Sequence, residues 1–428
     1  MRRLPGVRFT TPDPAPDAAS VLRHVRDRPG LYVHIPFCRS LCPFCPYNKV
    51  RYHAGLAADY GTALQRELAA YLAAGAEPFS SLYVGGGTPT LCPELLELVS
   101  RRVTVTGERA IEVLPSHLTE SMAARLLAAG FDAVSLGVQS FDPDVLQHLG
   151  RPTTATQNRD AVARAVGRFR CVDVDLLFDT AFDRPAVLLA DLATCLAMGA
   201  DQVSTYPLMR FGYTPFGKRP HQPRLEHRLL REAADLAADH GYERRSVWTF
   251  NRAGGPTYSS ITRPAYVGVG AGAATSAGTW FLVDHFGVAP YLAAVDAGRL
   301  PIARLAQLSP TAAGVYRLFW QLYTGTLPTG FVTRGPGGAR WLTAALHLGR
   351  AAGWLAATPD GLHLTASGYD RYHDVERAVT YRLIEPLWAE LMAEHGAGEG
   401  IVVSDRRPAA RTLGSASVGL SRGRRRRR

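Results

Sequence analysis

The chain has 428 residues, of which 46% are hydrophobic, so it is long enough for two or three domains with buried cores. It holds no apolar run of the roughly 18 residues that a membrane span needs, and residues 1–20 lack the apolar stretch of a signal peptide, so we expect a cytoplasmic protein with no membrane partner. The net charge of +11 comes mostly from residues 401–428, where nine arginines face one acid, and this tail is predicted to be disordered.

Strand-like and helical segments alternate from residue 31 to about residue 241. Runs rich in β-branched and aromatic residues predict strands at 31–35, 81–84, 110–113, 133–138, 171–178 and 202–206. Apolar residues at helical spacing predict helices at 56–74, 93–101 and 223–240, and a helix capped by Thr119 that ends near Gly130. Strand-then-helix units in series predict an α/β fold with a parallel sheet, either doubly wound or a partial barrel. Ligands of such sheets gather at the carboxyl ends of the strands.

The pattern changes after residue 245. A glycine-rich loop at 268–273 is followed by predicted helices at 309–323 and 339–351, a hairpin at 355–364 and a long helix at 367–394. This order is typical of a winged-helix-like domain. Arg340 and Arg350 are the only charges of the helix that would read DNA, so we do not expect a nucleic-acid partner.

Three of the six cysteines lie within eight residues of one another. Cys38, Cys42 and Cys45 have the spacing C-x3-C-x2-C on the loop that leaves the first predicted strand. Three thiolates leave one iron of a [4Fe–4S] cluster without a protein ligand, and that iron could bind the methionine part of S-adenosylmethionine (SAM). The alternative is a structural zinc site, which would need a fourth ligand such as His34 or His53.

The sequence around these cysteines resembles a known family. Leu-Tyr-Val-His-Ile-Pro-Phe-Cys-Arg-Ser-Leu-Cys-Pro-Phe-Cys, residues 31–45, resembles the cysteine loop of radical SAM proteins related to oxygen-independent coproporphyrinogen III oxidase, and the resemblance continues to about residue 390. It implies a partial (β/α)6 barrel over residues 31–245, between an N-terminal extension (1–30) and a C-terminal domain (246–395) that covers the active site. The tail then spans 396–428.

Further motifs match the family's SAM-binding segments at successive strand ends. Gly85-Gly-Gly-Thr-Pro follows the second strand, and Asp173 and Asp175 alternate with apolar residues on the fifth, where Asp173 could be only a paired core acid. The chain departs from the family at Leu114, usually Asn, and after Phe178. The resemblance implies that SAM is bound by Tyr32, Phe44, Gly86, Gly87, Thr88, Glu112, Gln139, Arg151 and Asp175, with Pro207 and Ala274 beside a second SAM molecule; it assigns no catalytic residue.

Three members of the family remain as alternatives. Coproporphyrinogen dehydrogenases usually carry a further cysteine where this chain has Tyr47. The related haem chaperone lacks that cysteine and would need an axial ligand such as histidine. The class C radical SAM methyltransferases also lack it, and they are our prediction. In these enzymes one SAM yields a radical and a second supplies the methyl group for an sp² carbon, with cyclopropane formation as a related outcome. The expected partners are an aromatic or heterocyclic small molecule and an electron donor such as flavodoxin or ferredoxin.

Overall fold

A computed structural model describes residues 7–25, 27–178, 185–217, 222–259, 263–331 and 339–395. The arginine-rich tail predicted to be disordered lies outside these ranges, as does the loop directly after Phe178. Among the described helices, none combines the length and the apolar character that crossing a membrane requires.

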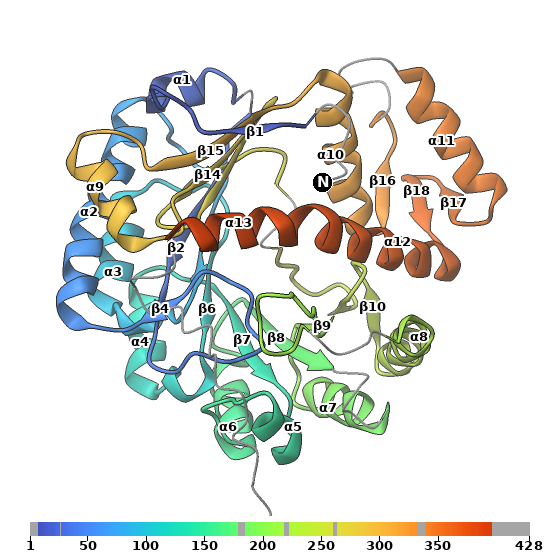
Figure 1. The fold of residues 1–428 in the computed structure, drawn as a ribbon. Coiled ribbons are helices and arrows are strands. Elements are labelled where there is room, and N and C mark those ends of the chain that lie inside the picture. Colours follow the sequence, from blue (N-terminus) through green and yellow to red (C-terminus); the bar gives the residue numbers. More distant parts are fainter. Residues whose placement is uncertain are drawn as a thin grey trace, which may run out of the picture.

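One open sheet of 13 strands forms the centre of the molecule (Figure 1). Its strands are β1 (Phe9–Thr10), β2 (Gly30–Ile35), β5 (Ser81–Gly86), β6 (Arg109–Val113), β7 (Ala133–Gln139), β8 (Cys171–Phe178), β9 (Gln202–Pro207), β10 (Tyr242–Arg244), β11 (Thr249–Arg252), β12 (Tyr266–Val269), β13 (Ala274–Ala277), β14 (Trp280–Asp284) and β15 (Ile302–Gln307). Their order is β1-β15-β14-β13-β12-β2-β5-β6-β7-β8-β9-β11-β10. The run from β12 through β2 to β9 is parallel, which confirms the six predicted strands and the partial-barrel fold.

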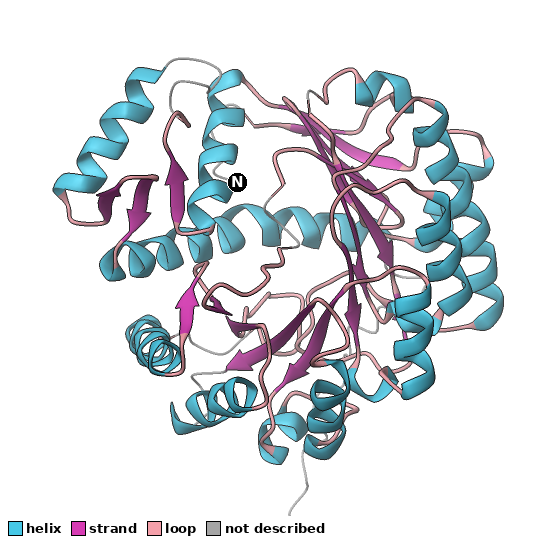
Figure 2. Cartoon of the chain, turned by 180° about the vertical axis from the view of Figure 1, so that it is seen from behind, coloured by secondary structure: helices cyan, strands magenta, loops and turns pink. Residues whose placement is uncertain are grey.

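Helices cover the outer face of the parallel strands (Figure 2). They are α1 (Ala18–Leu22), α2 (Ala54–Ala73), α3 (Pro93–Arg102), α4 (Glu120–Ala128), α5 (Pro143–His148), α6 (Ala155–Ala165), α7 (Pro185–Ala197) and α8 (Pro223–Asp239), with 3-10 turns at Pro89–Leu91 and Pro115–His117. The Thr119 side chain accepts a hydrogen bond from the Met122 amide, as its predicted capping role requires. Leu64 and Leu68, one turn apart on α2, are fully buried, so the apolar face of the helix forms the core with the sheet.

The sheet continues beyond residue 245. The sequence analysis treated 268–273 as a glycine-rich loop and missed the strands around it. In the structure β12 pairs in parallel with β2, and β13, β14 and β15 extend the sheet as antiparallel strands. β1, from the N-terminal extension, pairs antiparallel with β15 at the edge of the sheet. α9 (Val288–Asp296) links β14 to β15. β12 and β13 have only four residues each, too few for the alternating pattern that identifies a strand in sequence.

The C-terminal region crosses the open side of the sheet. α10 (Pro310–Tyr323), β16 (Thr326–Pro328), α11 (Ala339–Ala351), β17 (Leu355–Thr358) and β18 (Gly361–Leu364) form the predicted helix–helix–hairpin arrangement. α12 (Ala366–Val379) then runs through a π-helical turn, Thr380–Ile384, into α13 (Glu385–His395). Figure 1 shows this long helix in front of the curved sheet, so the C-terminus covers the barrel's inner side.

Candidate metal and SAM site

The three clustered cysteines lie on a loop that two short strands close. β3 (Phe37–Cys38) directly follows β2 and pairs with β4 (Val50–Arg51), so Cys38 lies opposite Arg51 at the neck of the loop. Cys42 and Cys45 lie within the loop, where the Cys45 amide donates to the Cys42 carbonyl at 3.3 Å. All three thiols are free. The strand pairing therefore presents three sulfur ligands on one short segment at the carboxyl end of β2.

Burial controls the acidity of the clustered thiols. Burial raises the pKa of Cys38 to about 11, and burial also raises the pKa of Cys45, which the positive charge of Lys49 lowers in part. Such thiols stay protonated at neutral pH until a cationic metal centre displaces the proton. Within the described ranges, no three His, Cys, Asp or Glu side chains gather closely enough to hold a single metal ion. The donor set of three thiols fits a [4Fe–4S] cluster with one open iron.

His34, one of the two residues considered as a fourth zinc ligand, has both ring nitrogens engaged. Nε2 lies 3.0 Å from the Asn48 carbonyl and Nδ1 lies 2.7 Å from the Tyr32 hydroxyl. Because a carbonyl only accepts, Nε2 carries the proton and Nδ1 accepts from tyrosine. Burial lowers the pKa of His34 to about 4, so the ring is neutral. His34 is therefore committed to holding the cysteine loop and is not placed as a metal ligand.

The glycine motif after β5 packs directly on the cysteine segment. The Gly87 amide donates to the Ile35 carbonyl and the Thr88 amide to the Phe37 carbonyl, both at 2.8 Å. A Cβ on Gly87 would lie 2.6 Å from the Phe37 oxygen, so no larger residue fits there. The Thr88 hydroxyl lies 3.6 Å from the Cys38 sulfur. The glycines thus serve protein packing in addition to any ligand contact, a reason the sequence analysis did not foresee.

Two predicted carboxylates lie half-buried on β6 and β8, two strands that β7 separates in the sheet. Glu112 on β6 accepts hydrogen bonds from the Tyr83 hydroxyl and, at 3.1 Å, from the Gly86 amide. Asp175 on β8 accepts from the Ser135 hydroxyl at 2.5 Å. Burial raises the pKa of both acids. The structure therefore brings Glu112 and Asp175 to the inner side of the sheet.

Asp173, which was predicted as a candidate paired acid of the core, has that role. Its carboxylate accepts hydrogen bonds from the Gln202 amide at 2.9 Å and from the Ser204 hydroxyl at 3.0 Å. These partners come from the neighbouring strand β9, so Asp173 fixes the β8–β9 pairing rather than offering a free carboxylate.

Gln139 and Arg151 meet beside Gly137. A Cβ on Gly137 would lie 3.1 Å from the Gln139 side-chain nitrogen and 3.6 Å from an Arg151 guanidinium nitrogen. Arg151 donates to the Gly137 carbonyl at 2.5 Å and lies 3.7 Å from the Cys42 sulfur. The guanidinium therefore connects the end of β7 to the cysteine loop. Two motifs separated in sequence form one polar patch next to a predicted iron ligand.

The other predicted residues divide between this site and its surroundings. Tyr32 stacks on Tyr83 with ring centroids 5.8 Å apart, beside Glu112. Phe44 is buried against the apolar residues Val145, Leu149, Leu208 and Phe216, so it anchors the cysteine loop. Pro207 ends β9 in register with Phe178. Ala274 packs against an apolar cluster that includes Phe286 and residues of α13.

Asn48, which was not predicted as a site residue, links the cysteine loop to residues 271 and 286. Its side-chain amide donates to the carbonyls of Ala271 at 2.9 Å and Phe286 at 2.8 Å, and its own carbonyl accepts from His34. Asn48 is only 4% exposed. Position alone, three residues after Cys45, was the only signal in the sequence, because both acceptors are backbone groups more than 220 residues away.

Aromatic rings from three segments line up beside the cysteine loop. Trp388 of α13 stacks on Phe211 with centroids 5.9 Å apart and an interplanar angle of 12°, and it lies 5.8 Å from the ring of Tyr47. Tyr47, two residues after Cys45, is 56% exposed despite this contact. The neighbouring Tyr213 hydroxyl donates to the Pro46 carbonyl at 3.2 Å. We call Tyr47, Phe211 and Trp388 the aromatic wall; none of the three is among the residues that were predicted to bind SAM.

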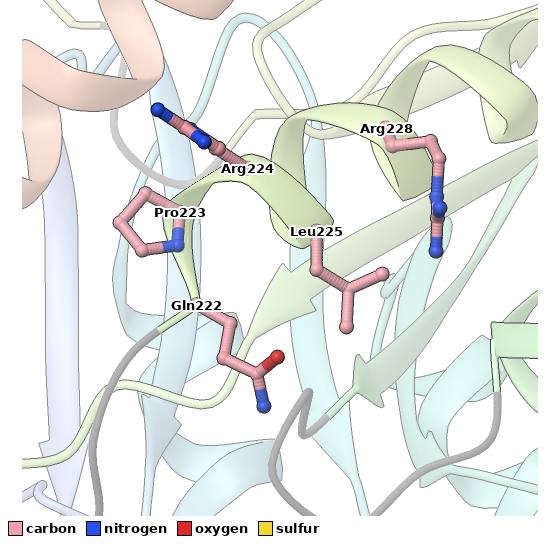
Figure 3. A pocket seen from close by; sticks show the side chains of 5 residues that line it. All are labelled: Gln222, Pro223, Arg224, Leu225 and Arg228. Atoms are coloured by element: carbon pink, nitrogen blue, oxygen red, sulfur yellow. The ribbon is translucent and has the colours of Figure 1, made fainter.

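A separate pocket of about 620 Å³ opens at the start of α8 (Figure 3). It is lined by Gln222, Pro223, Arg224, Leu225 and Arg228. None of these residues was predicted as a site residue.

Comparisons with known proteins bear on the family of the residues that carry the cysteine loop. Residues 32–193 match the radical SAM superfamily, so the chain carries a radical SAM domain. The chain is 28% identical to the heme chaperone HemW of Bacillus subtilis over 56% of its length and 69% of that protein's. It is 31% identical to the oxygen-independent coproporphyrinogen III oxidase of Paracoccus denitrificans, over 53% of its length and about half, 54%, of that relative's.

A solved structure supports the fold. Coproporphyrinogen III oxidase (HemN) from Escherichia coli, described as a radical SAM enzyme, superimposes with a TM-score of 0.71 at 22% identity, over 85% of this chain and 93% of that one. This chain thus shares the fold of that enzyme. The comparisons give no support to the class C methyltransferase branch that the sequence analysis predicted; they favour its two alternatives.

Proposed function

We propose that this protein is a radical SAM enzyme that holds a [4Fe–4S] cluster through Cys38, Cys42 and Cys45, cleaves SAM, and acts on a flat tetrapyrrole-type ring. One observation carries the proposal: Arg151 contacts both Cys42 and the end of β7, where the Gln139 amide lies. This arrangement supports a SAM site that adjoins the iron ligands directly. When bound, the cluster supplies the electron that breaks a carbon–sulfur bond of SAM.

The residues of the chain divide the work of holding SAM. The Arg151 guanidinium is suited to the SAM carboxylate, because its planar fork pairs with two oxygens at once. The Gln139 amide can donate and accept, as ribose hydroxyls require. Asp175, with one oxygen bonded to Ser135, keeps acceptor capacity for a ribose hydroxyl or the ammonium group. A single SAM molecule accounts for these groups; a second one remains a proposal that rests on Pro207 and Ala274.

The aromatic wall supports a flat, conjugated substrate. Tyr47 has an exposed ring and lies two residues after Cys45 in the sequence. Its ring contacts Trp388, which in turn stacks on Phe211. Stacking on aromatic faces favours planar ligands. The names of the relatives, heme chaperone and coproporphyrinogen III oxidase, both refer to tetrapyrroles. A tetrapyrrole or a comparably flat heteroaromatic ring therefore fits the chemistry of this wall.

Methyl transfer to an sp² carbon is the second candidate. Tyr47 occupies the position where coproporphyrinogen dehydrogenases usually have a further cysteine, which speaks against porphyrinogen oxidation. A tyrosine at this position is compatible with both the haem chaperone and the methyltransferase, because both groups lack the further cysteine. Each enzymatic reading also requires a one-electron donor such as flavodoxin or ferredoxin, which we retain as the proposed protein partner.

The first experiment tests SAM cleavage. Anaerobically reconstituted protein should bind about four irons and four sulfides, and with dithionite it should release 5′-deoxyadenosine. Replacing Cys38, Cys42 and Cys45 together with alanine should abolish both results. The matched control replaces Cys92, Cys171 and Cys195, which lie outside the loop, and should keep the iron. Stoichiometric zinc with no iron uptake would overturn the proposal.

The second experiment identifies the reaction. Haem and coproporphyrinogen III are offered in turn to the reduced enzyme with SAM, and tetrapyrrole products, 5′-deoxyadenosine and S-adenosylhomocysteine are quantified. Consumption or stoichiometric binding of a tetrapyrrole without S-adenosylhomocysteine supports the main proposal. Formation of S-adenosylhomocysteine in step with 5′-deoxyadenosine supports methyl transfer instead. Binding of neither tetrapyrrole would refute the proposed substrate class.

A further inference from the structure

The end of β7 has an unusual backbone. Gln139 has a φ of +70°, and it is the one non-glycine residue with positive φ among the described residues. The β7–β8 register also shifts between Leu136 and Gln139. A residue with a Cβ adopts this conformation only when its surroundings impose it. The strained residue is the one whose amide lies beside Arg151.

Asn158 of α6 holds the peptide groups on both sides of Gln139. Its side-chain nitrogen donates to the Val138 carbonyl at 3.1 Å and to the Ser140 carbonyl at 2.9 Å. Because both neighbours are carbonyls, the nitrogen of the amide must be the atom that faces them. Asn158 is fully buried, so water does not compete for these bonds. The two carbonyls that flank the strained residue are therefore fixed by one side chain.

A second buried side chain holds the residues that follow. Asp191 of α7 accepts from the Ser140 hydroxyl at 2.5 Å and from the Phe141 amide at 3.0 Å. Asp191 is 5% exposed. Residues 138–141 are thus held from two helices: Asn158 holds the carbonyls on either side of Gln139, and Asp191 holds the two residues that follow.

This arrangement is not one that stability alone would select. The Asn158 Oδ1 atom is buried and receives no hydrogen bond from any described residue. An unpaired buried acceptor opposes folding, as does a positive φ at a glutamine. Two unfavourable features at one turn point to a function for the conformation that they maintain.

We propose that Asn158 is a positioning residue for SAM: it imposes the Gln139 conformation and thereby aims the Gln139 amide at SAM beside Arg151. The inference rests on the proposed function, since it assumes that SAM binds at this patch. Asn158 itself touches no ligand. If its amide were lost, the two carbonyls would be free to rotate, Gln139 would return to a negative φ, and its side chain would leave Gly137 and Arg151.

The test is a double-mutant cycle on SAM affinity. Asn158→Leu, which keeps the side-chain size and removes both donors, should raise the SAM dissociation constant of the reconstituted protein by about tenfold. In a Gln139→Gly background, which has no amide to aim and no strain at positive φ, the same change should alter affinity by less than about twofold. Ser100→Ala is the matched control, because Ser100 is also buried on a helix and donates to a loop carbonyl.

Each outcome decides the inference. Equal losses of affinity in both backgrounds, or no loss in either, would overturn it, because a merely structural role does not depend on the Gln139 side chain. If Asn158→Leu does not fold, the smaller Asn158→Ser, whose hydroxyl cannot span both carbonyls, is carried through the same cycle. A wild-type protein that binds iron but no SAM would refute the proposed function; normal wild-type SAM binding without coupling would refute only the role of Asn158.

Discussion

Replacing Asn48 with aspartate tests how the cysteine loop is held. The change keeps the shape of the side chain but removes the two N–H groups that reach the carbonyls of Ala271 and Phe286. Both acceptors are buried with the 4%-exposed Asn48, so each loses its partner away from water. At about 1–3 kcal/mol for each buried group left unpaired, the expected loss of stability is about 3 kcal/mol.

The assay is urea denaturation of the anaerobic protein, with iron content measured on the same samples. The control is Gln147→Glu, also an amide-to-carboxylate change but on the exposed face of α5, which should alter stability by less than about 0.5 kcal/mol. The loss at Asn48 should be smaller at acidic pH, where a protonated aspartate can donate one bond again. A loss no larger than the control's, at every pH, would refute the idea that Asn48 links the two segments.

Three further changes probe the site and the core. Arg151→Met should weaken SAM binding by roughly 10- to 100-fold while sparing iron, because a charge-assisted bond is lost and no iron ligand is replaced; loss of iron in this variant would mean that the contact between Arg151 and Cys42 serves the cluster rather than SAM. Trp388→Leu should raise the dissociation constant for haem by roughly tenfold by equilibrium titration, and unchanged haem affinity would exclude the aromatic wall. Burial raises the pKa of Glu67 from 4.5 to about 7, so the folded state binds more protons than the unfolded one, and this contribution to stability is present below pH 4.5 and lost as pH rises through about 7. Glu67→Gln should flatten that part of the profile of urea midpoints against pH, and an unchanged profile would show that Glu67 does not carry it.

The polar network around Glu67 shows why the C-terminal part of the sheet stays attached to the barrel. Glu67 of α2 accepts from the Gly270 amide at 2.9 Å and from the Tyr291 hydroxyl at 2.6 Å. Tyr60, also on α2, donates to the His34 carbonyl and accepts from the Ala271 amide, both at 2.8 Å. α2 thus holds residues 270, 271 and 291 together with β2, the strand that leads into the cysteine loop. The candidate site depends on both segments.

The sequence by itself determined the elements whose signals are local. Cys38, Cys42 and Cys45 are within eight residues of one another, so their spacing alone indicates a shared metal centre. The six parallel strands were found because their segments are rich in β-branched and aromatic residues, which is a local signal. The long C-terminal helix was also predicted from its periodicity, although its π-helical turn at Thr380–Ile384 was not.

The tertiary structure alone decided the interactions that join distant segments. The Asn48 amide meets backbone carbonyls 223 and 238 residues away, and a backbone acceptor leaves no mark in the sequence. Asn158 looks like any polar residue of a helix, yet it holds the turn at Gln139 from the next layer. Trp388 joins the aromatic wall only because α13 crosses the open side of the sheet. Local motifs identify which chemistry the chain can perform. The tertiary structure decides which buried polar groups position the residues of the site, because these contacts join segments that are far apart in the sequence and leave no local pattern.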